Sequence, residues 1–179
     1  MGRVLSRALE AAGLSDFQAR VQSGTALTSA ELAELRDVDL LLLASLADVM
    51  RAHHHGDRVR IVRAPTQLTG PWVVFDGTPT EHGATGAELL REIALLRLAT
   101  PPSSAVAISM ETLGLELAQT ALLFGADTLI GDLGSARTLP LLEGSSARRI
   151  ELAGLVTRSG RRASFIDASE REEQHAEAP

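Results

Sequence analysis

Residues 105–131 read AVAISMETLGLELAQTALLFGADTLIG, and this stretch decides which fold we expect. The apolar segment 105–110 predicts a strand, and leucines at helical spacing over 113–124 predict a helix that ends at Gly125. Residues 127–131 predict a second strand. A strand, a helix and another strand in succession are typical of α/β proteins with a parallel sheet.

The same alternation extends outward in both directions. Strand patterns occur in RVRIVR (58–63), in WVVF (72–75) and at 162–166, and helices are predicted over 85–99 and 148–157. The expected fold class is therefore α/β, with a mainly parallel sheet of four strands plus a short C-terminal strand.

The two ends of the chain differ from this central pattern. Residues 1–38 predict short helices, and a longer helix is expected from about Asp39, a good N-cap, to His54. We divide the chain into an N-terminal helical segment (1–38), an α/β domain (39–167) and an acidic tail (168–179). The tail ends in EREEQHAEAP, whose charge and lack of large apolar residues predict disorder.

Composition excludes several function classes. The chain has 179 residues, a net charge of -6, no cysteine and no lysine, so all 17 basic residues are arginine. It can form no disulfide, no cysteine-ligated iron–sulfur cluster and no lysine Schiff base. The acidic balance and 3% aromatic content argue against nucleic-acid binding. No apolar run reaches the roughly 18–20 residues that span a bilayer, so we expect a cytoplasmic protein without a membrane span.

Residues 52–57 read AHHHGD, which raises the question of a metal site. Imidazoles and a carboxylate are zinc ligands by type. Adjacent residues of a helix, however, point about 100° apart, so three consecutive histidines cannot converge on one ion. We expect His53 to His55 to form the last turn of a helix that Gly56 ends, and we expect no metal site.

Two arginine pairs and two serines are further candidates for binding or catalysis. Arg148-Arg149 and Arg161-Arg162 are expected on solvated faces, with a surface for an anionic partner as the alternative. Ser109 and Ser164 lack the Gly-x-Ser-x-Gly context of a nucleophile elbow, so we expect no serine nucleophile.

Several motifs resemble one enzyme family. Ala47-Asp48 in the long helix, HGDRV at 55–59, TGAELLREIALLRLAT at 85–100 and FGAD at 124–127 carry the resemblance. They are similar to motifs of the radical S-adenosylmethionine enzymes of the futalosine route to menaquinone: aminofutalosine synthase, dehypoxanthine futalosine cyclase and the deazaflavin chromophore synthases. The resemblance implies a TIM-type barrel in which 58–63 would be the first strand.

The chain departs from this family in one decisive region. Family members place a Cys-x-x-x-Cys-x-x-Cys loop for a [4Fe–4S] cluster after the first strand, whereas this chain continues as RAPTQLTGPWVVFDG (63–77). The chain is about half the family's usual length, so strands two to five would be missing. The resemblance then implies a half-barrel with the sixth, seventh, eighth and first strands as neighbours, in the order 72–75, 105–110, 127–131, 58–63. Its free sheet edges predict a homodimer or a protein partner.

Two functions follow from this comparison. The first is a non-catalytic pseudoenzyme of menaquinone biosynthesis that has no cofactor and binds a metabolite or a partner enzyme. The alternative is a small cofactor-free enzyme that uses Glu111 and Asp132, with His82 as a possible base, at the end where barrels place their chemistry. Met110 and Asp76 would then line the ligand site with these carboxylates. The simpler interpretation is that Glu111 caps the following helix and Asp132 is solvated.

Overall fold

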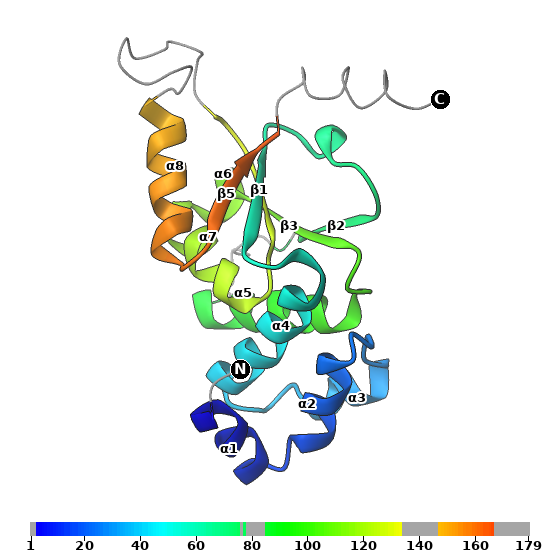
Figure 1. Cartoon of the computed structure of the whole chain (residues 1–179). Coiled ribbons are helices and arrows are strands. Elements are labelled where there is room, and N and C mark those ends of the chain that lie inside the picture. Colours follow the sequence, from blue (N-terminus) through cyan, green and yellow to red (C-terminus); the bar gives the residue numbers. More distant parts are fainter. Residues whose placement is uncertain (1–2, 76, 78–84, 134–146, 167–179) are drawn as a thin grey trace.

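A five-stranded, all-parallel sheet is the centre of the protein (Figure 1). The computed structural model describes residues 3–75, 77, 85–133 and 147–166. In chain order the elements are α1 (Arg3–Ala11), α2 (Ser15–Gln22), α3 (Ser29–Glu34), α4 (Leu40–His55), β1 (Arg58–Val62), η1 (Pro65–Gln67), β2 (Trp72–Phe75), α5 (Gly86–Ala99), β3 (Ala105–Ser109), α6 (Met110–Leu113), α7 (Leu115–Ala121), η2 (Leu122–Phe124), β4 (Thr128–Ile130), α8 (Ala147–Arg158) and β5 (Arg162–Phe165). The α/β fold class is therefore confirmed.

The strand order in the sheet is β2-β3-β4-β1-β5. The first four strands follow the order that the resemblance implied, and every neighbouring pair is parallel. The expectation of four strands plus a short extra one needs correction. Strand β5 pairs with β1 from Arg58 opposite Arg162 to Ile61 opposite Phe165, so it is a full fifth member of the sheet. The pairing makes β1 an inner strand and leaves β5 as the edge of the sheet.

The two faces of the sheet are covered differently. On one face, Val59, Ile61 and Leu129 belong to a large core that also includes buried residues of α4, α5, α7 and α8. On the opposite face, Val62, Leu68, Ala107 and Ile130 form a small separate cluster. Leu68 comes from the connection between β1 and β2, which contains η1. Among the described residues, no helix contributes to this second cluster, and we call this side the open face.

The N-terminal helices pack on the same core as the sheet. Leu9, Val21 and Leu35 have no exposed surface and join the large cluster of α4 and α5. The backbone N–H of Leu27 donates to the carbonyl of Leu98, which ties the N-terminal segment to the end of α5. The acidic tail at 168–179 lies outside the described residues.

Local signals in the sequence account for the helix starts. Asp39 accepts hydrogen bonds from the backbone of Leu41 and Leu42, and Thr85 with Glu88 forms the expected capping box of α5. The single helix expected over 113–124 is wrong in detail. A short helix, α6, already begins at Met110, and Gly114, with a φ of 74°, separates it from α7 and η2.

Candidate functional site

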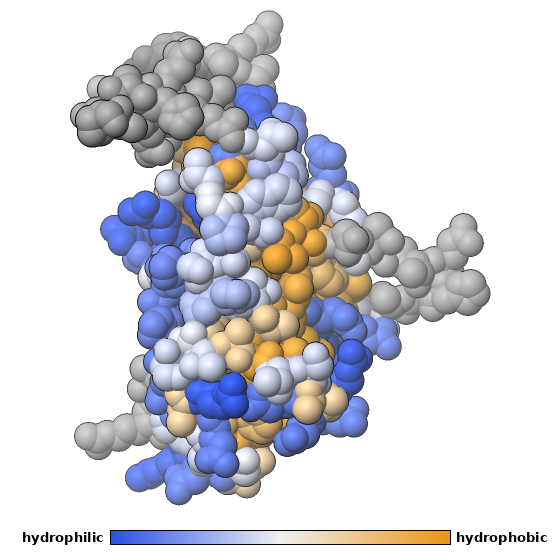
Figure 2. Space-filling model, turned by 90° about the vertical axis from the view of Figure 1, so that its right-hand side faces the viewer, coloured by the Kyte–Doolittle hydropathy of each residue, from blue (hydrophilic) through white to orange (hydrophobic). Residues whose placement is uncertain are grey.

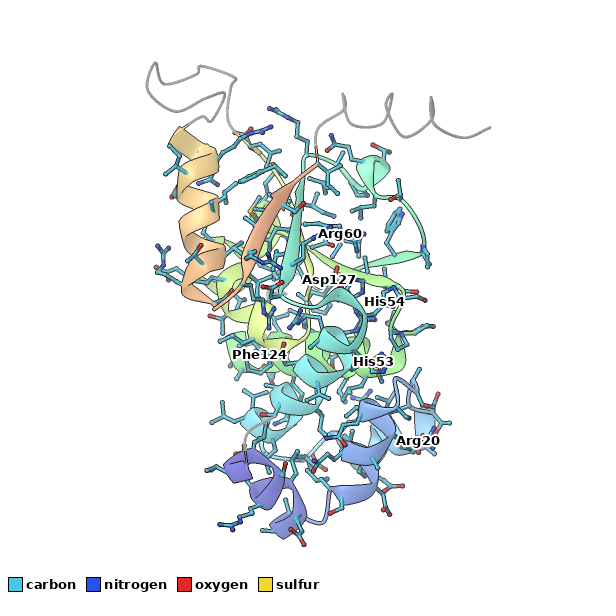
Figure 3. All side chains as sticks on the ribbon, in the orientation of Figure 1. Arg20, His53, His54, Arg60, Phe124 and Asp127 are labelled. Carbon is cyan, nitrogen blue, oxygen red and sulfur yellow. The ribbon has the colours of Figure 1, made fainter. Side chains whose placement is uncertain are left out.

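Asp127 is the centre of a buried charged network at the amino edge of the sheet (Figure 3). Its side chain is 1% exposed and lies just before β4. One carboxylate oxygen accepts from Arg60 at 3.2 Å and from the hydroxyl of Thr128 at 2.7 Å. The other accepts from Arg97 at 3.2 Å and from the backbone N–H of Val106 at 2.9 Å. A buried charge needs such partners, and here the acid of the FGAD motif links β1, α5 and β3.

Arg97 is the largest fully buried side chain in this network. It donates to the carbonyl oxygens of Pro101 and Ser104 as well as to Asp127. Burial lowers the pKa of Arg97, although the charge of Asp127 acts in the opposite direction. Gly125 makes room for it, because a Cβ at that glycine would lie 2.5 Å from Cγ of Arg97.

A second ion-pair set is centred on Asp48. Asp48 accepts from Arg51 at 2.8 Å and from Arg161, and these two arginines are 4% and 6% exposed. Arg161 also donates to the carbonyl of Ala126. Burial lowers the pKa of Arg161 to about 10, with Asp48 opposing the change. The expectation that Arg161 lies on a solvated face is therefore wrong, because its guanidinium lies between α4 and the segment before β4.

The three histidines lie in different surroundings at the end of α4, which Gly56 ends with a φ of 57°. The ring of His53 lies beside Gly24, where a Cβ would be 2.9 Å from it. Nε2 of His55 lies 3.3 Å from the carbonyl of Ser104 and 3.6 Å from Asp127. Within the described part of the chain, no three His, Asp or Glu side chains are grouped to hold a metal ion.

The pKa of His55 is lowered. Burial is the largest cause, and Arg97 and Arg60 add to it, whereas Asp127 raises the pKa. The ring is thus held neutral beside Asp127, which already receives the positive charges of both arginines. The contact between His55 and Asp127 is a polar contact of a neutral ring and not an ion pair.

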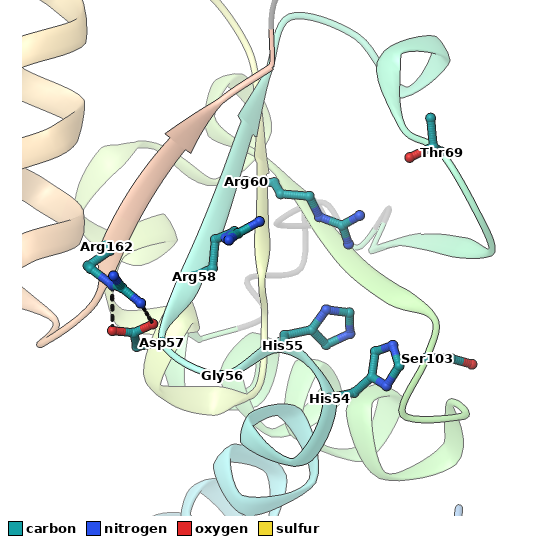
Figure 4. A pocket seen from close by; sticks show the side chains of 9 residues that line it. All are labelled: His54, His55, Gly56, Asp57, Arg58, Arg60, Thr69, Ser103 and Arg162. Carbon is teal, nitrogen blue, oxygen red and sulfur yellow. Dashed lines mark hydrogen bonds and ion pairs between the residues drawn. The ribbon is translucent and has the colours of Figure 1, made fainter. Parts of the chain in front are cut away.

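A polar cavity of about 600 Å³ lies beside this network, over the amino half of the open face (Figure 4). Arg58 and Arg60 extend from β1 toward the side on which Thr69 lies, and His54 and His55 lie below them. The lining comes from α4, β1, β5 and three connections, and consists of His54, His55, Gly56, Asp57, Arg58, Arg60, Thr69, Ser103 and Arg162. Segments far apart in the sequence thus build one polar site.

The arginines of this cavity are paired unequally. Arg162 donates two hydrogen bonds of 2.7 Å to Asp57, and this contact lowers the pKa of the Asp57 carboxyl. Arg60 reaches Asp127 through one nitrogen only. Arg58 is exposed and has no hydrogen-bond or ion-pair partner among the described residues. The cavity therefore carries an excess of positive charge in a chain whose net charge is -6.

The residues expected to be catalytic lie elsewhere. Met110 and Glu111 follow β3, and Asp132 follows β4, so all three lie at the carboxyl edge of the sheet. A Cβ at Gly131 would be 3.9 Å from Cγ of Glu111, which brings the Glu111 and Asp132 segments together. None of these residues lines the polar cavity. Asp76 and His82, the other candidates, lie outside the described residues.

The helix start after β3 and the arginines of β1 both differ from what was expected from the sequence. Ser109 caps α6 by accepting from the backbone of Thr112, and Glu111 lies inside that helix. The cap that Glu111 was expected to give the following helix is not formed, because α7 begins after Gly114 without a side-chain cap. Arg58 and Arg60 were not among the site residues expected from the sequence. The alternation in RVRIVR was the available signal, because it places both arginines on one face of a strand.

A second cavity, of about 410 Å³, lies beside the edge strand β2. Its lining is mostly apolar and consists of Leu32, Arg36, Val73, Val74, Phe75, Glu92, Leu95, Leu96 and Ala99. Figure 2 views the molecule from this side and shows apolar side chains exposed along the face. Trp72 and Val73 of β2 are among the large apolar residues with substantial exposed surface.

The sequence was compared with known proteins. No protein-family model matches it, and no curated protein matches it significantly. Among the described helices, none is long and apolar enough to cross a membrane.

Proposed function

We propose that this protein binds a small molecule in the polar cavity of its open sheet face and performs no chemistry on it. The single observation that carries the proposal is the cavity of about 600 Å³ whose lining converges from α4, β1 and β5. Ligand sites of proteins are concave and contain a few convergent polar groups, and this volume is in their usual range. Of the described charged side chains that line it, Asp57, Arg60 and Arg162 are engaged in ion pairs and Arg58 is not.

We further propose that the chain is a cysteine-free, half-barrel relative of the radical S-adenosylmethionine enzymes of menaquinone biosynthesis, and that it acts in the cytoplasm as a pseudoenzyme. The strand order β2-β3-β4-β1 supports this origin, because these strands would be neighbours in a closed barrel. The motif residues also have structural roles that a relative would retain. Asp48 and Asp127 hold buried arginines, and Gly56 ends α4.

A substitution that fills the cavity tests the binding function. Ser103 is exposed and lines the cavity, so Ser103→Trp should fill it without disturbing the core. Ser29→Trp on α3 is the matched control, because Ser29 is exposed and lies outside the lining. We expect native mass spectrometry to detect a small molecule with the wild type and S29W but not with S103W. The released compound should also return unchanged after incubation with the protein, and equal retention by S103W would refute the proposal.

A cofactor-free enzyme remains the second candidate. The observation that favours it is the proximity of the Glu111 side chain to Gly131, which precedes Asp132. Two carboxylates at one sheet edge could share acid–base chemistry. The same incubation tests this function: a compound that wild type converts and that E111Q leaves unchanged would establish catalysis at this edge.

We also propose that two copies associate through β2. Within the described residues, β2 is an edge strand that pairs only with β3. The apolar cavity lies next to β2. The cavity carries one cation, Arg36, and one anion, Glu92, and neither has a side-chain partner among the described residues. A surface with one charge of each sign is self-complementary across a two-fold axis, which supports a second copy as the occupant.

A further inference from the structure

Arg58 and Arg60 form one side of the polar cavity. They alternate with Val59 on β1, so both point to the open face, roughly 6–7 Å apart along the strand. Arg58 lies opposite Arg162 on β5. Three guanidinium groups therefore lie on one small area of the sheet, and like charges in such positions repel one another.

The carboxylates nearby do not balance these charges. Asp57 is bound by Arg162 through both oxygens. Asp127 is shared between Arg60 and Arg97. Among these groups four arginines face two carboxylates, and Arg58 has no partner in the described part of the chain. An excess of two positive charges remains, which is the charge that one dianion would neutralise.

The N–H donors of the arginines in this cavity suit an oxyanion for two reasons: their fork geometry, and the limited screening of the Arg60 charge by solvent. A guanidinium presents a planar fork of N–H groups that binds carboxylate or phosphate oxygens in pairs. The side chain of Arg60 is 21% exposed, so solvent and salt screen its charge less than they screen a surface residue. Thr69, Ser103 and the ring of His54 line other parts of the same cavity, and all three residues carry hydrogen-bonding groups.

We infer that the ligand is a small organic dianion, either a phosphate monoester or a dicarboxylate, whose oxyanion is held between Arg58 and Arg60. This inference rests on the proposed binding function and specifies its chemical class. The cavity volume of about 600 Å³ exceeds what one oxyanion needs, so an organic group of the ligand lies toward Thr69 and Ser103. The net charge of -6 opposes a polyanion such as a nucleic acid but not a single dianionic group.

Titration calorimetry of the full chain with phenyl phosphate, phthalate and the neutral analogue benzyl alcohol tests this inference. We expect at least one dianion to bind more tightly than benzyl alcohol, with an affinity that falls as salt rises. Arg58→Gln should weaken that binding by about tenfold or more, the effect of losing a charge-assisted contact. Arg58→Lys keeps the charge without the fork and should weaken it less. Arg7→Gln on α1 is the matched control, because Arg7 is exposed and does not line the cavity.

The results separate the ligand class from the binding function. No binding of either dianion at millimolar concentration, or equal affinity of R58Q and R7Q, overturns the inference. A neutral compound that binds the wild type, is excluded by S103W and is insensitive to R58Q overturns the anionic class but leaves the binding function intact. An oligonucleotide that binds more tightly than both dianions and depends on Arg58 also overturns the inference.

Discussion

Arg97 and Asp127 form an ion pair of 3.2 Å between side chains that are 0% and 1% exposed. Asp127 also accepts hydrogen bonds from Arg60, Thr128 and the backbone of Val106. The pair joins the end of α5 to the residue before β4, so it fixes the amino edge of the sheet on which the polar cavity lies.

Removal of the Asp127 carboxylate should strongly destabilise the fold. In Asp127→Ala, Arg97 keeps its buried charge but loses its counter-ion, and we expect a loss of about 3–5 kcal/mol in the free energy of unfolding. Urea denaturation followed by circular dichroism measures this. Asp37→Ala is the control, because Asp37 is exposed and makes no described ion pair. A loss below about 1 kcal/mol in D127A would contradict the role of Asp127.

Substitution of Gly125 by alanine should lower the free energy of unfolding by more than backbone strain alone would. Gly13 and Gly125 both have positive φ, 73° and 93°, but only Gly125 has close neighbours at the Cβ position. We expect Gly13→Ala to lower the free energy of unfolding by about 1 kcal/mol and Gly125→Ala by roughly 2–4 kcal/mol, because Arg97 must move. Thermal denaturation of the two variants compares them directly. Equal losses would mean that Arg97 accommodates the added methyl group.

The stability of the protein should fall in mildly acidic solution because of His55. Its pKa in the folded state is lowered from the ordinary value of 6.5, so the unfolded chain binds the proton more readily. Stability from this group is complete above pH 6.5 and is lost as pH falls below it toward the folded pKa. His55→Gln should flatten the stability–pH curve in this window, measured by urea denaturation. His54→Gln, at the exposed neighbouring ring, should keep the wild-type slope.

The Asp57 carboxyl acts in a separate pH window. The pKa of Asp57 is lowered below its ordinary value of 3.8 by Arg162, so its contribution is lost only below that pH. A decline of wild-type stability that begins near pH 4 and is unchanged in H55Q would contradict the assignment to His55.

A charge on the β2 edge should dissociate the proposed dimer. We expect the wild type to sediment as a dimer at micromolar concentration and Val73→Arg to sediment as a monomer, because the substitution places a charge on the exposed edge strand. Leu41→Arg is the control, since Leu41 is 71% exposed on α4, and it should remain dimeric. A monodisperse wild-type monomer would refute association through β2.

Radical chemistry should be absent from this chain by itself. A [4Fe–4S] cluster of this class needs three cysteine thiolates, and the chain contains no cysteine. Anaerobic reconstitution with iron and sulfide should give no absorption at about 400 nm. Incubation with S-adenosylmethionine and dithionite should give no 5′-deoxyadenosine. Stoichiometric cluster with cofactor turnover would refute the pseudoenzyme proposal, and activity only with a cysteine-bearing partner would make the chain a subunit.

The positions of residues at the carboxyl edge of the sheet could be predicted from the sequence, but the position of the polar cavity could not. The sequence correctly placed Glu111 and Asp132 after neighbouring strands, because parallel strands end at the same edge. It could not show that the large polar cavity lies at the other edge. That cavity depends on β5 pairing with β1 and on the connection that carries Thr69, and neither contact is local in the sequence.

The sequence by itself determined what depends on interactions within a few residues. The caps at Asp39 and Thr85 and the stop at Gly56 are of this kind, as is the alternation that placed Arg58 and Arg60 on one face. The tertiary structure alone decided which charges are buried. Arg161 and Arg97 look like any surface arginine in the sequence, and they are buried because Asp48 and Asp127 reach them from distant segments. The cost of desolvating each charge is offset only by a partner that folding brings to it.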